Sequence, residues 1–546
     1  MTDDTQVLVV GAGPVGLTAA LELRRRGVDC RLVDLLPERQ PYARAVGVQP
    51  RTLEIWDRSG VARAALDAAV PVRGQLVYVN GAEQARIELT LPPEVPYGFA
   101  ALPQYETERI LEERLAVHGT HVERGTALVS FTQDAKGVTS RLRTAAEEDR
   151  EVRSEFLVGC DGAHSVVRRQ LGLSFEGGAF PEEYMLADVE LDWELPAGYG
   201  VRAMHRAEDG TVDDLLVCIP LPGRSRYRVS TTVPPELSHH RPPDAAEPGE
   251  PAHGPDNGQT PRIDHIEKVL ERLSPVPCTA SALRWSSVFR ISHRIVDRYA
   301  DGRVFVAGDA AHIHPPTGAQ GMNTGIQDAY NLAWKLALAV KGVAQPRLLE
   351  SYEAERRPVG EEVVGRTVRH AAEGVQADPD DPATVMTREA QLLVSYRGSP
   401  VVERDATGGP GPGPGPAAGD RAPDCTGLRD ALCAFPLRLF DLLRERDHVL
   451  LLYADSADRA ADFDELADEA RNVARGELTC YALLADGVEA PGLLLPVIRD
   501  GAGEFRRAYG AEGSTALLIR PDGHLGVRAA PASRLDVLAA LARVFT

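Results

Sequence analysis

Short apolar runs that end at a glycine or an acidic residue recur along the chain. They occupy residues 6–10, 31–33, 156–158 and 304–307. The first, third and fourth runs lead through a turn into a segment with helical features, such as the apolar spacing of Leu17, Ala20 and Leu21. This pattern predicts buried parallel strands that alternate with helices, and therefore an α/β fold.

Between about residues 175 and 290 the pattern changes to strands with few helices. Strands are predicted at residues 184–191, 215–220 and 227–233, and a helix at residues 263–273. Residues 238–261 are polar and rich in proline, as expected of an exposed or poorly ordered loop. The histidines of this loop have no cysteine or carboxylate at ligand spacing, so no metal site is predicted.

The last part of the chain is separated from the rest by a segment rich in glycine and proline. A helical stretch continues from residue 336 to about 397, and residues 408–416 then contain only glycine and proline. Such a segment cannot hold a helix or a central strand, so it is predicted to be a linker. Strands at residues 449–453 and 516–519 and a final helix at 533–544 predict a further folded unit.

The first apolar run is followed by a glycine-rich motif, GAGPVG. Gly11 permits a tight turn, Gly13 lets a pyrophosphate approach the backbone, and Gly16 allows a helix to pack closely on the strand. Asp34 ends the next apolar run, where it is placed to accept a hydrogen bond from a ribose hydroxyl. The motif therefore predicts dinucleotide binding by a turn made of Gly11, Gly13, Pro14, Val15 and Gly16.

The fourth apolar run ends in a second glycine-rich turn, in residues 304–336. Gly308 and Asp309 end the predicted strand, and Pro316, Gly318 and Gly321 follow in the turn. The turn leads into a helix whose first N–H groups favour negative charge, and its glycines let the backbone approach a flat ligand. Taken alone, this motif is also compatible with an ordinary connection between a strand and a helix.

A third motif, GCDGAHS at residues 159–165, lies between these two. With all three motifs in order, the sequence resembles the class A FAD-dependent aromatic hydroxylases, which include para-hydroxybenzoate hydroxylase, phenol hydroxylase and the polyketide hydroxylases of actinomycetes. The resemblance is strong over residues 5–352 and weaker beyond. It implies a Rossmann-like FAD-binding domain, a β-sheet substrate domain and a C-terminal thioredoxin-like domain.

The resemblance also implies where these domains begin and end. Residues 1–175 form the first part of the FAD-binding domain, and residues 176–290 form the substrate-binding β-sheet domain. The chain then returns to the FAD-binding domain and a helical connection in residues 291–397. A Gly/Pro linker, residues 398–419, precedes a thioredoxin-like domain at residues 420–546 that has no CxxC pair, so a structural or assembly role is expected of it.

The family further implies roles for individual residues. Asp161 and Asp309 are expected to bind the cofactor, Asp309 through the ribityl hydroxyls. Arg44 is expected near the phosphates and Gln104 at the ribityl chain, although a solvated arginine and a polar residue at a helix start are the plain alternatives. The remaining expected contacts are adenine near Leu128, the reactive flavin edge at Pro316 and the turn from Gly318, and the flavin pyrimidine oxygens at the backbone of Gly321, Met322 and Asn323.

The activity that the resemblance implies is oxygen transfer to an electron-rich ring. FAD, tightly bound, is reduced by NADPH or NADH, which binds transiently because the chain has only one GxGxxG unit. O₂ then adds at the flavin C4a, and the distal oxygen of this C4a-hydroperoxyflavin passes to a phenolic or polycyclic polyketide-like substrate. Baeyer–Villiger oxygen insertion on the same scaffold, or a non-catalytic flavin-holding partner protein, are the alternatives.

No catalytic acid or base can be assigned from the sequence. His312 belongs to the family's Gly-Asp-Ala-Ala-His string and is expected to be a structural hydrogen-bonding residue, whereas His314 fits the surface or the pocket edge equally well. His205 and Tyr227 of the middle domain could deprotonate a phenol, but no spacing singles out either one. Flavin halogenases and disulfide reductases are disfavoured because the WxWxIP and CxxC signatures are absent.

Composition agrees with a large enzyme that acts on a small molecule. The 546 residues are 43% hydrophobic, and a net charge of −20 argues against nucleic acid as a partner. No apolar run is long enough to span a membrane and the first residues lack a basic signal, so we expect no membrane association and a cytoplasmic protein. Seven cysteines without a CxxC pair indicate free thiols. A homodimer is considered, although the sequence does not determine the oligomeric state.

Overall fold

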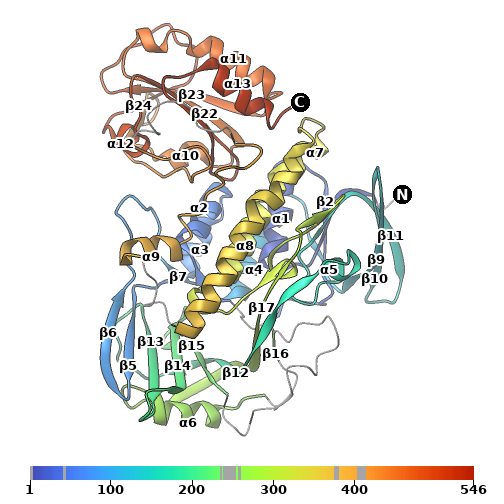
Figure 1. Cartoon of the computed structure of the whole chain (residues 1–546), viewed down its shortest axis with the longest axis vertical. Coiled ribbons are helices and arrows are strands. Elements are labelled where there is room, and N and C mark those ends of the chain that lie inside the picture. Colours follow the sequence, from blue (N-terminus) through green and yellow to red (C-terminus); the bar gives the residue numbers. More distant parts are fainter. Residues whose placement is uncertain are drawn as a thin grey trace.

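A computed structural model describes residues 4–40, 45–233, 237, 254–255, 260–373, 380–402 and 414–546. Three parts follow one another from bottom to top in Figure 1. A large mixed sheet, which we call the middle sheet, lies below an α/β core, and a C-terminal module lies above it. Arg44 and the histidines of the 238–261 loop fall outside the described residues.

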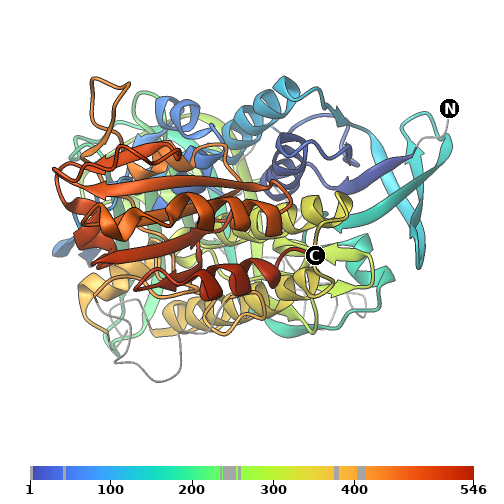
Figure 2. The same cartoon turned by 90° about the horizontal axis from the view of Figure 1, so that it is seen from above.

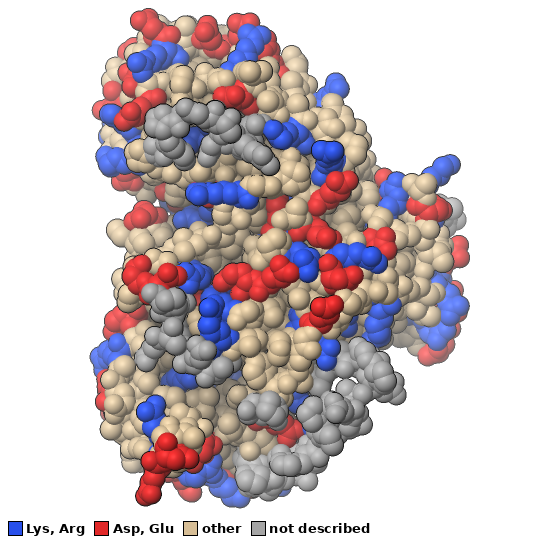
Figure 3. Space-filling view, viewed as in Figure 1, with Lys and Arg blue, Asp and Glu red and all other residues tan. Residues whose placement is uncertain are grey.

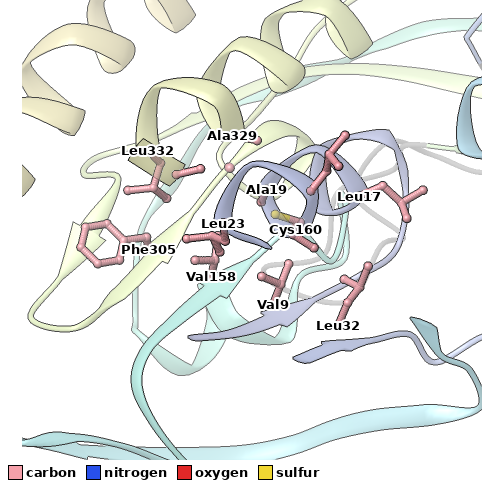
Figure 4. Close-up of a cluster of buried hydrophobic side chains, with 14 of the residues drawn as sticks. Val9, Leu17, Ala19, Leu23, Leu32, Val158, Cys160, Phe305, Ala329 and Leu332 are labelled. Carbon is pink, nitrogen blue, oxygen red and sulfur yellow. The ribbon is translucent and has the colours of Figure 1, made fainter. Parts of the chain in front are cut away.

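The α/β core is built on the predicted parallel sheet. Its strands lie in the order β18-β19-β11-β1-β2-β8, and β1 pairs in parallel with β2 and β11, which in turn pairs in parallel with β19. Helix α1 packs against α7 on this sheet, and Figure 4 shows Val9, Val158, Phe305 and Leu332 in their shared apolar cluster. The strands are β1 (Thr5–Val10), β2 (Cys30–Val33), β8 (Val122–Glu123), β9 (Thr126–Asp134), β10 (Gly137–Thr144), β11 (Asp149–Gly159), β18 (Ala300–Asp301) and β19 (Val304–Val306).

Helices and a small sheet complete the α/β core. The three-stranded sheet has the order β3-β7-β4. Its strands are β3 (Gly47–Val48), β4 (Val70–Pro71) and β7 (Ala100–Ala101). The helices are α1 (Pro14–Arg25), α2 (Pro50–Arg58), α3 (Ala62–Ala68), α4 (Gln104–Val117), α5 (Val166–Gln170), α7 (Gly321–Val340), α8 (Arg347–Glu373) and α9 (Pro382–Glu389). Figure 1 shows α8 running past the core from the module towards the middle sheet.

The middle sheet has the strand order β16-β17-β12-β15-β14-β13-β5-β6, with β20 paired to β17. Strands β5 and β6 come from the first 175 residues, and β12 and β17 cross residues 175 and 290, so several separate chain segments assemble this sheet. The domain limits given above stay predictions. The strands are β5 (Gly74–Val79), β6 (Ala82–Glu88), β12 (Phe175–Leu191), β13 (Tyr199–Arg206), β14 (Val212–Pro220), β15 (Arg226–Thr232), β16 (Gly254–Pro255), β17 (Ala280–Val296) and β20 (His312–Ile313).

The two faces of the middle sheet have different environments. Helix α6 (Ile263–Leu273) covers one face, where Met185 and Ala187 pack fully buried against Ile266. The other face is turned towards the α/β core, because Ile219 packs against a cluster that includes Val46 and Ala101 of the core. A domain that covers one side of a ligand site is expected to have such a face.

The C-terminal module is a six-stranded sheet of order β21-β24-β23-β22-β25-β26. Strands β22, β23 and β24 are parallel and β25 and β26 antiparallel, an arrangement consistent with the expected thioredoxin-like domain. Figure 2 shows the elements of the module running across the top of the molecule. The elements are β21 (Leu428–Asp430), α10 (Leu439–Leu443), β22 (His448–Ala454), α11 (Phe463–Val473), β23 (Leu478–Ala485), β24 (Val497–Asp500), α12 (Glu504–Tyr509), β25 (Ser514–Ile519), β26 (Leu525–Ala529) and α13 (Arg534–Ala542).

The module shares its apolar core with helix α7. Trp334 and Leu338, on the last turns of α7, are buried in the same cluster as Leu450 and Leu518 of the module. A domain joined only through a flexible linker would expose these α7 residues. The module is therefore an integral part of the fold.

A buried ion cluster also joins the module to the core. Lys335 of α7 donates to Glu355 of α8 at 2.7 Å, and Arg520 of the module donates to both oxygens of the same carboxylate at 2.7 and 2.8 Å. Arg520 also pairs with Asp522, whose carboxylate accepts from Asn331 at 3.1 Å. All five side chains are buried, so the two positive and two negative charges offset each other within the interface.

The charged surface is mixed in sign. Figure 3 shows acidic and basic side chains interspersed over the visible face. That face offers no continuous basic patch of the kind that binds nucleic acid. No described helix is both long and apolar enough to cross a membrane.

Candidate functional site

The three sequence motifs meet at one edge of the core sheet. Strands β2, β1, β11 and β19 are neighbours and all parallel, so their carboxyl ends lie side by side. Gly11, Asp34, Asp161 and Asp309 each follow one of these ends. In open α/β sheets this edge is where ligands bind.

The glycines of the first motif serve two different purposes. A Cβ on Gly11, whose φ is +98°, would lie 2.3 Å from the Cys160 carbonyl oxygen, and a Cβ on Gly16 would lie 1.8 Å from the Gly11 oxygen. These two glycines therefore allow close packing. A Cβ on Gly13 would meet no atom within 4 Å, so the space in front of the α1 start is open, as a pyrophosphate would require.

The first motif and the second glycine-rich turn interlock through Val15. A Cβ on Gly308 would lie 2.8 Å from Val15 Cγ2, and one on Gly325 of α7 would lie 2.7 Å from the same atom. Pro14 occupies the first turn of α1, where its missing N–H costs nothing. The two glycine-rich turns are thus held against each other by packing that tolerates no added side chain.

Asp34 lies beside the first glycine-rich turn. Its Oδ2 accepts from the Ala12 amide at 2.6 Å and its Oδ1 from the Leu36 amide at 2.8 Å. The Thr126 amide donates to the Asp34 carbonyl at 2.8 Å, which brings the start of β9 and the buried Leu128 to this end of the site. Asp34 and Leu128, which are expected at the ribose and the adenine, therefore lie at the same end of the site.

The carboxylates of Asp161 and Asp309 differ in the hydrogen bonds that they accept. The Asp161 carboxylate accepts from Ser165 Oγ at 2.5 Å and from the Val166 and Val167 amides at 2.7 and 3.1 Å, so it caps helix α5, and burial raises its pKa. Asp309 is half-buried in a single 3₁₀ turn, and no described residue donates a hydrogen bond to its carboxylate. The Asp309 oxygens are therefore available to a ligand hydroxyl.

Gln104 connects helix α4 to the segment after Arg44. Its Oε1 accepts from the Ala45 amide at 3.1 Å, and its Nε2 donates to Glu108 at 2.8 Å. Burial raises the pKa of Glu108, although its hydrogen bond to Gln104 opposes the rise. Gln104 thus holds the backbone at Ala45, directly after Arg44, the residue predicted to bind the phosphates.

The second glycine-rich turn delivers the start of helix α7 to the site. Pro316 precedes a 3₁₀ turn that contains Gly318 at φ +71°, and α7 begins at Gly321. Because the first amides of a helix have no acceptor within the helix itself, Gly321, Met322 and Asn323 can donate to a ligand there. This arrangement fits the expected contact with flavin oxygens.

The Asn323 side chain holds this turn in place. Its Oδ1 accepts from the Gln49 amide at 2.9 Å and from Thr52 Oγ1 at 2.7 Å, and its Nδ2 donates to the carbonyls of Gly47 at 2.9 Å and Ala319 at 2.7 Å. The side chain is therefore fully engaged within the protein. Asn323 can reach a ligand through its backbone amide.

Gln49 is a site residue that the sequence did not indicate. Its Nε2 donates to the Gly318 carbonyl at 2.6 Å, whereas its Oε1 is buried and has no donor among the described residues. An acceptor without a donor next to this turn fits a flavin pyrimidine, which carries an N–H between two carbonyl groups. No motif includes Gln49, and only its position at the start of α2 could have drawn attention to it.

The turn is also supported from behind by residues 389–391. Gln320 donates to the Glu389 carboxylate at 2.9 Å and accepts from Gln391 at 2.7 Å. Arg366 of α8 pairs with the same Glu389. No sequence motif includes these residues, because they lie about 70 positions after the turn that they support.

His312 is a structural residue next to the site. Its Nε2 lies 2.7 Å from Asp328 Oδ2, and Arg356 donates to the other oxygen of Asp328 at 2.7 Å. Burial would raise the pKa of Asp328, but Arg356 and His312 outweigh it and hold this pKa below its usual value. The His314 ring is buried and lies 3.6 Å from the Cβ position of Gly321, so it belongs to the pocket edge and not to the surface.

The two middle-domain candidates for a base lie away from the core-facing side of the sheet. His205 pairs with Asp213 at 2.6 Å at an exposed strand end. Tyr227 stacks on Trp193 with ring centroids 5.5 Å apart, in the cluster covered by α6, and burial raises its pKa. Neither residue is therefore assigned a catalytic role.

Comparison with known proteins agrees with this geometry. Residues 4–367 match the family model described as FAD binding domain, and residues 415–546 match the one described as aromatic-ring hydroxylase, C-terminal. The chain is 32% identical to a flavin-dependent monooxygenase of Mycobacteroides abscessus, over 98% of this chain and 99% of that one. It is 33% identical to 6-methylpretetramide 4-monooxygenase of Streptomyces rimosus, over 96% and 91% of the two chains.

A solved structure shows the same likeness over the whole chain. The ternary complex of aklavinone-11 hydroxylase with FAD and aklavinone has a TM-score of 0.76 and 26% identity, covering 100% of this chain and 99% of that one. The open space at Gly13, the available Asp309 carboxylate and the Gln49 oxygen are features that a bound FAD would use. The chain belongs to the FAD-dependent aromatic hydroxylases and is a flavin-dependent monooxygenase.

Proposed function

We propose that this monooxygenase hydroxylates a polycyclic phenolic substrate, with FAD at the strand-end site and NADPH or NADH as a transient reductant. The observation that carries the proposal is the meeting of the three motifs around the open space at Gly13 and the available carboxylate of Asp309. The names of the similar 6-methylpretetramide and aklavinone enzymes support a substrate of this kind. The cytoplasmic location and the homodimer stay predictions.

The residues of the chain divide the work of holding the cofactor. Gly13 and the first amides of α1 would bind the pyrophosphate, and Asp34 would accept from the adenosine ribose. Asp309 would accept from the ribityl hydroxyls. The amides at the start of α7 would donate to the flavin pyrimidine oxygens, and Gln49 would accept from its N–H group.

The two domains would create the environment for the reaction. Bound FAD supplies the redox chemistry that activates O₂ with electrons from the nicotinamide. Helix α7, held by Asn323, directs its positive end at the flavin oxygens, where negative charge gathers. The middle sheet covers the substrate and keeps water away, so that oxygen is transferred to the ring and not lost to solvent.

Anaerobic reduction of the purified yellow protein tests this function. FAD should lose its visible absorbance on addition of one of the two nicotinamides, faster when a polycyclic phenol is present. On admission of isotope-labelled O₂, one labelled oxygen should enter the phenol with its rings intact. A ring-expanded product would favour Baeyer–Villiger insertion, and a protein that binds FAD but oxidises no nicotinamide would be a non-catalytic flavin holder.

A further inference from the structure

One arginine on the middle sheet stands apart from the others. Arg202 lies on β13 between Val201 and Ala203, which are both buried in the cluster under helix α6. Because successive side chains of a strand point to opposite faces, Arg202 belongs to the face turned towards the α/β core. Ile219 and Arg226 lie on that same face: Ile219 packs against a cluster that includes Val46 of the core, and Arg226 donates to Tyr105 of the core at 3.3 Å.

The surroundings of Arg202 on this face are mainly apolar and partly accessible. Across the sheet, Arg202 is paired with Val217, Val217 with Ser230, and Ser230 with Leu186. All four side chains are half-buried, whereas Met185 and Val201 on the α6 face are completely buried. A face that is turned to another domain and is still partly accessible leaves room for a ligand between the two.

The charge of Arg202 has no partner among the described residues. The neighbouring Arg228 pairs with Asp188 at 2.5 Å, and Arg290 pairs with Glu183. No described residue forms an ion pair or a hydrogen bond with the Arg202 guanidinium, and its Nε is buried. Burial lowers the pKa of Arg202, opposed only by Tyr184. A partly buried cation without a partner is unfavourable unless a ligand supplies the missing anion.

We propose that Arg202 binds an ionised oxygen, a phenolate or a carboxylate, of the aromatic substrate. Its planar guanidinium can donate two parallel hydrogen bonds to such a group, while Leu186 and Val217 contact the ring system. This inference rests on the proposed function and extends it, because it selects acidic aromatic molecules over neutral ones. Arg202 would thereby determine substrate specificity and orientation.

Two ligands of similar shape test this role on the FAD-loaded protein. Anthraquinone-2-carboxylate carries the anion and 2-methylanthraquinone lacks it, and their dissociation constants are measured from the change in flavin absorbance. The wild type should bind the carboxylate about tenfold or more tightly than the neutral compound, since charge-assisted hydrogen bonds are strong. Arg202→Met should remove this preference and leave binding of the neutral compound within about twofold.

The controls separate specificity from folding and from the function itself. Arg202→Lys should retain part of the preference, and Arg206→Met, at an exposed end of the same strand, should retain all of it. Arg202→Met should melt no lower than the wild type, because no described residue pairs with the guanidinium. The proposal is overturned if the wild type has no preference for the anion or if Arg202→Met keeps it. FAD content and nicotinamide oxidation are recorded on the same samples, so failure of the proposed function appears separately, as absence of flavin or turnover.

Discussion

Two carboxylates at neighbouring strand ends show how little a residue type alone says about its role. The Asp161 carboxylate accepts hydrogen bonds from Ser165 and two amides of helix α5, whereas the Asp309 carboxylate accepts from no described residue. The first therefore stabilises the protein, and the second is free to bind a ligand. Their substitutions should have different consequences.

Asp309→Ala should purify colourless or weakly yellow, because the ribityl chain loses its acceptor. The melting temperature of the apoprotein should stay close to that of wild-type apoprotein, since no protein hydrogen bond is removed. Flavin absorbance per protein and a thermal melt measure both effects. Undiminished flavin content would contradict the assignment of Asp309.

Asp161→Ala is the matched comparison at the residue scale. It removes the acceptor of three hydrogen bonds at the start of α5 and should destabilise the apoprotein by about 1–3 kcal/mol. Chemical denaturation of the two apoproteins side by side gives the difference. An Asp161→Ala apoprotein as stable as wild type would show that the cap contributes nothing.

At the scale of elements, the start of helix α7 is fixed to the second glycine-rich turn and to residues 47–52 by one amide side chain. Asn323 satisfies two donors and two acceptors from residues 47–52 and 319. Asn323→Asp would leave the Gly47 and Ala319 carbonyls without donors, at a cost of about 1–3 kcal/mol for each. We expect a lower melting temperature and at least about tenfold weaker FAD binding, measured by fluorescence titration of the apoprotein. Asn472→Asp, at an exposed position of α11, should change neither quantity.

The buried ion pair between Lys335 of α7 and Glu355 of α8 should make the stability of the protein depend on pH. Burial would raise the pKa of Glu355, but Arg520 and Lys335 outweigh it and lower the value from 4.5 to about 2. A lowered folded-state pKa stabilises the protein above pH 4.5, and this contribution is lost as the pH falls towards 2. Burial also lowers the pKa of Lys335, from 10.5 to about 8, so stability rises with pH between these values as well.

Glu355→Gln tests this dependence. At neutral pH it should cost about 3–5 kcal/mol, because Lys335 and Arg520 lose their buried counter-charge. Below pH 4.5 the melting temperature of the variant should fall less steeply than that of the wild type. Glu361→Gln, at an exposed site on the same helix, serves as the control. Parallel acid profiles for wild type and Glu355→Gln would contradict the role of Glu355.

The elements of the site were easier to predict from the sequence than its supports. Gly11 and Gly16 could be recognised because the local spacing of strand, glycine and helix determines their roles, whereas the role expected of Asp309 was implied by the family resemblance. Gln49 and Arg202 could not, because their significance depends on which partners approach from distant segments and which do not. The same holds for β5, which joins the middle sheet by pairing in parallel with β13 more than a hundred residues later. Periodicity predicts a strand, but its neighbour in the sheet depends on the packing of the whole molecule.

At the scale of the whole molecule, the C-terminal module is needed to complete the core. Trp334, Leu338 and Leu348 are buried by contact with it, and Glu355 receives its Arg520 partner from it. A chain that ends at residue 402 should therefore be poorly soluble and melt well below the full chain, since large apolar side chains become exposed. Co-expression of residues 414–546 should restore solubility, as judged by gel filtration. A truncated chain with the melting temperature of the full protein would refute this view of the interface.

Helix α7 connects the candidate site with the interface to the C-terminal module. Its first turn is held in the candidate site by Asn323, and its last turns contribute Trp334 and Lys335 to the interface with the module. A chimera that takes its C-terminal module from a relative would need the matching residues of this helix as well. Exchanging the module without them would mismatch the interface and, because α7 is one continuous helix, weaken cofactor binding at the other end of the helix.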